Sequence, residues 1–201
     1  MQIYSFSRIL SWASRCLCAL TLILISSAIA YSSSHEFYKG KNLRIVVGFP
    51  AGGGFDTYAR ALSRHLGKHI PGNPSVVVDN MPGAGSMIGA NHVFKVAKPD
   101  GLTLGHFHGG LFLQQLIGRP GIEFDAAKFD FIGAPVTDKV ACAITKAAGI
   151  TNMESWLAAK TPVKLGATAP GTSGYDASRI LEHALKFPIH LVSGYKGTAD
   201  I

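Results

Sequence analysis

The fold is decided by the stretch Leu43-Arg44-Ile45-Val46-Val47-Gly48-Phe49-Pro50-Ala51-Gly52-Gly53-Gly54-Phe55-Asp56. Its first half is a short run rich in β-branched residues that stops at Pro50, which is typical of a buried strand. Three consecutive glycines follow, and apolar residues then recur at helical spacing from Thr57 to Ile70. The stretch therefore predicts a strand, a glycine loop and a helix in direct succession.

The same succession returns further along the chain. Residues 76–78 predict a second strand, residues 80–85 a second glycine loop, and residues 86–97 a second helix that ends before Pro99. A third strand is predicted over residues 102–107. Alternating strands and helices with nearly continuous apolar strands indicate an α/β fold, with a parallel sheet covered by helices on both faces.

A second α/β series is predicted after a looser stretch that begins at Gly118. The expected strands are residues 131–136, 140–145, 163–168 and 189–192, and the expected helices are residues 152–160 and 175–186. Thr151 and Glu154 would form a capping box for the first of these helices, and Ala169-Pro170-Gly171-Thr172-Ser173-Gly174 is a third glycine loop. We expect two domains, residues 31–125 and 126–201. The second is expected to be incomplete, because the chain stops just after a parallel strand whose covering helix has barely begun.

Residues 1–30 have the pattern of a secretory signal peptide. Arg8 and Arg15 precede a compact apolar run, and small residues follow it up to Ala30. The apolar run is shorter than the roughly 20 residues that cross a bilayer, which weighs against an uncleaved anchor. We expect export to the periplasm and cleavage near Ala30. Cys142 is then the remaining cysteine, which excludes an intramolecular disulfide and predicts a small buried side chain.

Composition and charge narrow the classes of partner. The chain has 201 residues, of which 47% are hydrophobic and 15% charged, as expected of a folded protein. The formal net charge of +7 falls to 17 − 12 = +5 without the first 30 residues, which contain two arginines and no acidic residue. The basic residues are scattered and form no run that would follow a nucleic-acid backbone. We therefore expect weak attraction of anions and no nucleic-acid partner.

Glycine loops that follow strands and open helices favour anion binding. Such a loop directs several unpaired backbone N–H groups toward one point, where the helix dipole adds positive potential. Gly52 to Gly54 leave room for a ligand to approach the backbone, and Asp56 could cap the helix predicted to begin at Thr57. The alternative is that these glycines only make a tight turn.

Motifs for catalysis, cofactors and metals are incomplete in this sequence. Gly83-x-Gly85-x-x-x-Gly89 follows a strand as a dinucleotide loop would, but no acidic residue ends the next strand to hold a ribose. Gly171-Thr172-Ser173-Gly174 lacks the spacing of a nucleophile elbow. His106 and His108 have no carboxylate or thiol beside them and are interpreted as isolated histidines. We expect no enzyme activity, no cofactor and no metal.

Four motifs together resemble a known family. They are residues 41–60 around the first glycine loop, Asn80-Met81-Pro82-Gly83-Ala84-Gly85-Ser86-Met87-Ile88-Gly89-Ala90, Pro99-Asp100-Gly101-Leu102-Thr103-Leu104, and Tyr195-Lys196-Gly197. In this order they resemble the tripartite tricarboxylate transporter substrate-binding receptors, the Bug family of periplasmic solute-binding proteins. The resemblance covers essentially all of the chain after the leader. It implies a type II periplasmic-binding-protein fold, with two Rossmann-like domains that close on a small carboxylate and deliver it to a membrane permease.

The resemblance also implies where the ligand is held. Loop 50–56 and loop 170–174 would grip a carboxylate from opposite domains through backbone N–H groups and bridging waters, with an apolar wall at Phe49 and a third contact from residues 193–198. The residues expected to bind the ligand are Phe49, Pro50, Gly52, Gly53, Gly54, Asp56, Gly171, Thr172, Ser173, Gly174, Ser193, Lys196 and Gly197. Members of the family continue beyond this point, so the chain is expected to be C-terminally truncated.

The function expected from these residues is that of an extracytoplasmic solute-binding receptor. It would capture a small organic acid or amino acid as a monomer and pass it to the permease of a tripartite tricarboxylate-type transporter. Two alternatives stay open at this point. One is a Rossmann-type nucleotide-dependent oxidoreductase, and the other is an exported α/β domain that binds no ligand because of the truncation.

Overall fold

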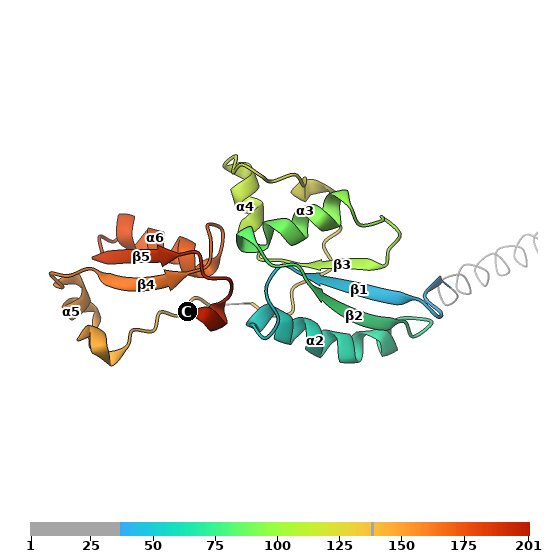
Figure 1. The fold of residues 1–201 in the computed structure, drawn as a ribbon, viewed down its shortest axis with the longest axis horizontal. Helices are drawn as coiled ribbons and strands as arrows, with labels where there is room; N and C mark the ends of the chain where they lie inside the picture. Colours follow the sequence, from blue (N-terminus) through green and yellow to red (C-terminus); the bar gives the residue numbers. More distant parts are fainter. Residues whose placement is uncertain (1–36, 138) are drawn as a thin grey trace, which may run out of the picture. The chain divides into compact units, whose positions relative to one another are not determined.

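The computed structural model describes residues 37–137 and 139–201 (Figure 1). The predicted signal peptide lies outside these residues. The described chain forms two compact units, a smaller one of residues 37–42 and 66–75 and a larger one of residues 43–65 and 76–201. Within the smaller unit the Ser75 amide donates to the Lys41 carbonyl at 3.2 Å, and the Lys41 ammonium lies 3.7 Å from the centre of the Phe37 ring.

The first sheet contains β1 (Asn42–Val47), β2 (Ser75–Asn80) and β3 (Thr103–His106) in the order β2-β1-β3. β1 and β3 pair in parallel, with Val47 opposite His106. β1 is the central strand, and its apolar residues Val46 and Val47 are completely buried. A strand buried on both faces needs apolar residues at successive positions, which explains the unbroken run that the sequence contains here.

Helices cover both faces of the first sheet, as predicted (Figure 1). α2 (Gly54–Leu66) covers one face, where Ile45 and Val47 pack with Ala59. α3 (Met87–Lys95) and α4 (Gly110–Leu116) cover the other, around a cluster of Ala90, Leu111 and Phe124 joined by further phenylalanines. These two apolar layers hold the carboxyl ends of the strands in place.

The second sheet pairs β4 (Val163–Ala167) with β5 (Ile189–Ser193) in parallel, with Val163 opposite Ile189. α6 (Ser173–His183) connects these strands, and α5 (Met153–Leu157) precedes them. The core here is built on Trp156 and Phe187, whose rings meet edge to face at 4.7 Å between centroids. The pairs β1–β3 and β4–β5 are parallel, and each of the three connections β1–β2, β2–β3 and β4–β5 contains a helix, which confirms the predicted α/β class.

An unusual turn precedes α3. Residues 83–86 have φ values of 137°, 49°, 67° and 77°, so four consecutive residues, including Ala84 and Ser86, adopt positive φ. Ser86 is completely buried and lies against Gly48, where an added Cβ would be 2.5 Å from the Ser86 Cβ. Only glycine at position 48 lets β1 and this turn approach so closely.

The middle of the chain differs from the prediction. Residues 131–136 and 140–145 are irregular and pair with no strand among the described residues, so the two strands predicted there are wrong. Phe131 and Ile132 are 68% and 82% exposed. An apolar run without a partner strand or a buried face does not form a sheet. Cys142, predicted to be buried, is exposed in the same stretch.

The helices also differ from the prediction in detail. α4 was not predicted, and α5 is capped by Asn152 with Ser155, not by Thr151 with Glu154, because the Asn152 side chain accepts from the Ser155 amide at 2.8 Å. Within residues 37–137 and 139–201, no helix is both long enough and apolar enough to cross a membrane. The domain boundary expected near residue 125 remains a prediction.

Candidate functional site

The strand order creates a candidate site at the carboxyl ends of β1 and β3. From β1 the chain passes through α2 to β2 on one side, and from β2 it passes through α3 to β3 on the other. The connections that leave β1 and β3 therefore diverge, and ligands of open α/β sheets bind at such switch points. Loop 50–56 leaves β1 here, and His106 ends β3 beside it, with its carbonyl accepting from the Gly48 amide at 3.1 Å.

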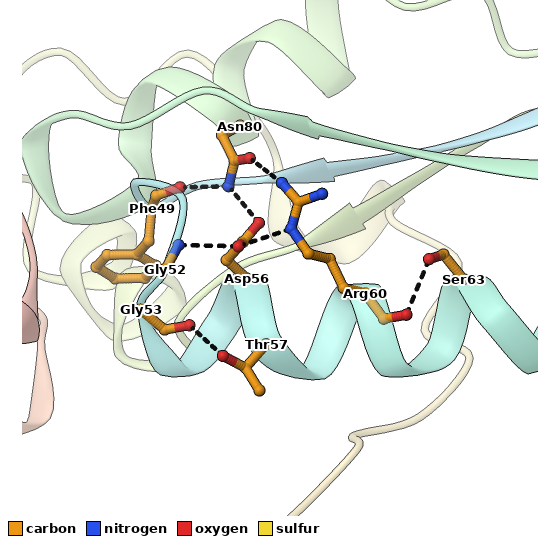
Figure 2. A network of polar contacts seen from close by, with 8 residues as sticks. All are labelled: Phe49, Gly52, Gly53, Asp56, Thr57, Arg60, Ser63 and Asn80. Atoms are coloured by element: carbon orange, nitrogen blue, oxygen red, sulfur yellow. Dashed lines mark hydrogen bonds and ion pairs between the residues drawn. The ribbon is translucent and has the colours of Figure 1, made fainter.

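Loop 50–56 is organised around the Asp56 carboxylate, which is buried with 3% of the residue exposed (Figure 2). Its Oδ2 accepts from the Gly52 amide at 2.9 Å and from Arg60 Nε at 2.8 Å, and its Oδ1 accepts from Asn80 Nδ2 at 3.0 Å. The same Asn80 nitrogen donates to the Phe49 carbonyl at 2.9 Å. Asp56 thus connects the loop to α2 and to β2.

Electrostatics keep Asp56 ionised. The hydrogen bond from Arg60 lowers the pKa of the Asp56 carboxyl to about 2, with further lowering from the Gly52 amide and the Asn80 amide against the opposing effect of burial. The carboxylate therefore carries its charge at all ordinary pH values and shares it with Arg60. Asp56 lies in the first turn of α2, which begins at Gly54, three residues earlier than predicted. It holds the loop from inside the helix.

Loop 170–174 has a similar backbone arrangement. Gly171 has a φ of +85° and donates its amide to Asp176 Oδ1 at 3.0 Å. Thr172 closes the turn, because its hydroxyl donates to the Ala169 carbonyl at 2.7 Å, and the buried Thr168 hydroxyl contacts it at 3.0 Å. α6 begins at the next residue, so its first-turn amides emerge directly from this loop.

Loop 170–174 is also contacted by residues 108–119, which belong to the segment around α4. His108 Nε2 lies 2.7 Å from the Ser173 hydroxyl, and Arg119 Nη1 donates to the Pro170 carbonyl at 2.7 Å. At Gly110 an added Cβ would be 2.4 Å from the Gly171 carbonyl oxygen, so the start of α4 approaches the loop as closely as glycine permits. Sequence reasoning missed His108 and Arg119, since their partners lie 65 and 51 residues further along the chain.

The third predicted segment begins at the end of β5. Ser193 and Lys196 are exposed, whereas Gly197 is buried against the Pro50 ring, where an added Cβ would be 3.5 Å from the nearest ring atoms. The Gly197 amide donates to Asp200 Oδ2 at 3.0 Å. The structure therefore brings two of the three predicted segments together at Pro50 and Gly197.

Aromatic rings line the region between β1 and β3. Phe49, 9% exposed, stacks on Phe55 at 4.4 Å between ring centroids. The Phe55 ring lies 5.0 Å from His106 and 6.1 Å from His108. Burial lowers the pKa of the His106 imidazole, which keeps this ring neutral at neutral pH. These histidines could have been assigned to the site from the expectation that parallel strands end at one edge of a sheet.

The predicted binding residues thus have defined places but no demonstrated ligand. In each of the three predicted segments a glycine amide is held by an aspartate, and contact with a ligand stays a prediction for all thirteen residues. Among residues 37–137 and 139–201, no group of three or more His, Cys, Asp or Glu side chains is placed to hold a metal ion.

Comparison with known proteins finds similar chains in two Bordetella species. No family model matches this chain. It is 38% identical to BugT of Bordetella pertussis over 90 residues, which are 45% of this chain and 27% of that protein. It is 31% identical over 172 residues to a UPF0065 protein of Bordetella bronchiseptica, and this match covers 83% of this chain and 50% of that protein.

Solved structures share the fold of this chain. The periplasmic binding protein BugD has 24% identity and a TM-score of 0.56, and shows the fold alone. The R. palustris protein Rpa4515, solved with adipate, has 25% identity and a TM-score of 0.63 over 80% of this chain and 54% of that one. The chain spans about half the length of these relatives. By its motifs, its parallel α/β sheets and these matches, the chain is similar to the Bug, or UPF0065, family of periplasmic binding proteins over about half of their length.

Proposed function

We propose that this chain is an extracytoplasmic receptor that binds a small carboxylate and delivers it to the permease of a tripartite tricarboxylate-type transporter. The observation that carries the proposal is the course of loop 50–56, which leaves the central strand β1 and leads straight into the first turn of α2. The adipate bound by the related R. palustris protein supports a carboxylate as the ligand class. Export through a cleaved leader near Ala30 and action as a monomer belong to the same proposal.

The backbone amides of loop 50–56 act as the donors in this proposal. The Gly52 amide already donates to Asp56, so Gly52 acts through its positive φ of 85° and not as a donor to the ligand. Gly53 and Gly54 supply the amides, since the first-turn N–H groups of a helix have no acceptor within the helix. A carboxylate suits these donors because charge-assisted hydrogen bonds are stronger than neutral ones.

The remaining contacts come from the second and third segments. Ser173 and Gly174 at the start of α6 offer hydroxyl and amide donors to the same carboxylate, while Thr172 holds the turn through its bonds to the Ala169 carbonyl. Phe49 and Pro50 give an apolar surface. Lys196 is exposed and can meet a second negative charge of the ligand. Asp56 contributes by holding Gly52 and Asn80, because its oxygens already accept from three protein groups.

Isothermal titration calorimetry of the chain with adipate and a panel of mono-, di- and tricarboxylates tests the proposal. Gly53→Val is the decisive variant, because an added Cβ would meet only the Pro50 carbonyl at 3.7 Å, which is an ordinary van der Waals contact. The branched side chain would nevertheless block approach of an anion to the backbone. Loss of one charge-assisted hydrogen bond costs about 1.5–3 kcal/mol, or about tenfold to a hundredfold in Kd.

Gly133→Val is the matched control, because Gly133 is exposed and an added Cβ there meets nothing within 4 Å, the loop included. It should leave the affinity unchanged. Gly171→Val, the second variant that the glycine loops suggest, is unsuitable, since its Cβ would be 2.6 Å from Gln114 at a φ of +85°. Absence of binding to every acid in the panel, or equal affinity of Gly53→Val and the unaltered chain, would contradict the proposal.

A further inference from the structure

His108 lies in the short turn between β3 and α4, and its ring contacts three parts of the larger unit. Its Nδ1 is 3.1 Å from the Gly110 amide nitrogen, and its Nε2 is 2.7 Å from the Ser173 hydroxyl oxygen. The ring centre is 6.1 Å from that of Phe55, which belongs to the first glycine loop. His108 therefore stands between Phe55 and the start of α6.

The hydrogen bonds of the ring fix where its proton resides. The Gly110 amide can only donate, so Nδ1 must accept with its lone pair and carry no hydrogen. In a neutral imidazole the proton is then on Nε2, which donates to the Ser173 oxygen. Because Ser173 receives this bond through a lone pair, its own hydrogen is left for another acceptor. The direction of donation runs from Gly110 through His108 to Ser173.

Close packing maintains this geometry. The Gly171 carbonyl leaves no space for a Cβ at Gly110, so the turn that carries His108 is held against the loop. Arg119 binds the Pro170 carbonyl at the other end of the same loop at 2.7 Å. The His108 amide also donates to the buried Ser86 hydroxyl at 3.4 Å. The ring has little freedom to leave Ser173.

We propose that His108 is a positioning residue that orients the Ser173 hydroxyl as a donor to the ligand carboxylate. The inference rests on the proposed function, because it assigns a role at the same site. The Ser173 hydroxyl is then a side-chain donor in addition to the backbone amides, and His108 fixes the direction in which it donates. A ligand group that cannot accept a hydrogen bond would leave the Ser173 hydroxyl unpaired and would bind less well.

A set of variants titrated with adipate separates this role from general packing. His108→Leu removes the donor to Ser173 and should weaken binding about tenfold, whereas His108→Gln can still donate through its amide nitrogen and should stay within about threefold of the unaltered chain. Ser173→Ala should also weaken binding about tenfold. The variant that combines His108→Leu with Ser173→Ala should bind no more weakly than Ser173→Ala alone, because both substitutions remove the same interaction with the ligand.

The control is His65→Leu, an exposed position on α2, which should leave the affinity unchanged. Nitrogen-resolved NMR of the His108 ring should find the proton on Nε2. Equal losses in His108→Leu and His108→Gln, additive losses in the double variant, or a proton on Nδ1 would each overturn the inference. If the unaltered chain binds no acid, the proposed function fails; if it binds and His108→Leu binds equally well, only the role of His108 fails.

Discussion

The loops that follow β1 and β4 share one backbone device but differ in what supports it. Gly52 and Gly171 both have a φ of +85°, and both donate their amides to an aspartate in the first turn of the following helix, at 2.9 Å and 3.0 Å. Each aspartate follows an aromatic residue that is preceded by glycine. The two α/β units therefore build their loops by the same rule.

The support for the first loop comes from its own α/β unit. Asp56 is buried and also accepts from Arg60 on α2 and Asn80 on β2. Asp176 is half-buried, and within the described residues its carboxylate accepts from Gly171 alone. The second loop is held instead by His108 and Arg119. The same turn can thus be held by its own unit or by residues distant in sequence.

The largest loss of stability is expected when Asp56 is removed. Asp56→Ala removes the buried carboxylate that accepts from the Gly52 amide, Arg60 and Asn80, and should lower the free energy of unfolding by about 3 kcal/mol because three hydrogen bonds to a charged group are lost. Urea denaturation at neutral pH measures this loss. Asp79→Ala, which breaks an ion pair at the surface, is the control and should cost well under 1 kcal/mol. A loss as small as that of the control would show that Asp56 does not hold the loop.

Acid should break the first loop in a defined pH range. The pKa of Asp56 is lowered from 3.8 to about 2 in the folded protein, so its contribution is complete above about pH 5 and is lost as the pH falls toward 2. The shift corresponds to about 2 kcal/mol. Urea midpoints measured between pH 5 and pH 2 should fall more steeply for the unaltered chain than for Asp56→Asn. Parallel curves would remove the electrostatic explanation.

The smallest effect is expected at Asp176. Asp176→Ala loses a single hydrogen bond to Gly171 and should reduce the free energy of unfolding by about 1 kcal/mol. Asp176→Asn keeps an oxygen acceptor and should restore most of that loss. Hydrogen exchange of the Gly171 amide, faster in the alanine variant than in the asparagine variant, reports the bond directly. A loss at Asp176→Ala equal to that at Asp56→Ala would mean that both loops depend equally on their aspartates.

Local sequence predicts most of the regular structure. The strands around Val46 and Leu165 and their glycine loops were found because a buried strand, a glycine turn and an amphipathic helix each leave a short-range pattern. α2 begins before the position predicted from Asp56, since the aspartate was interpreted as a cap and acts from inside the first turn. Tyr58 and Leu62 belong to the apolar residues that recur at helical spacing in this helix, yet both are about 40% exposed.

The contacts of the candidate site were harder to predict. Arg60 and Asn80 meet at Asp56 from two elements, and His108 meets Ser173 across 65 residues. Contacts between residues so far apart in the sequence leave no local sequence pattern. In the sequence, His108 stands out only as a possible metal ligand, and its hydrogen bond to the Ser173 hydroxyl has no local signal. The strands predicted at residues 131–136 and 140–145 failed for a similar reason, because apolar content does not reveal whether a partner strand exists.

The close approach of Gly48 to Ser86 has a consequence for the evolution of this chain. A Cβ at position 48 would lie 2.5 Å from the Ser86 Cβ and 2.8 Å from its Cα. Replacing Ser86 with glycine would remove the clash with its Cβ but not the clash with its Cα, so no substitution at position 86 makes room for a side chain at position 48. Gly48 is therefore expected to be nearly invariant among descendants that keep this turn, while the exposed Gly133 can drift freely.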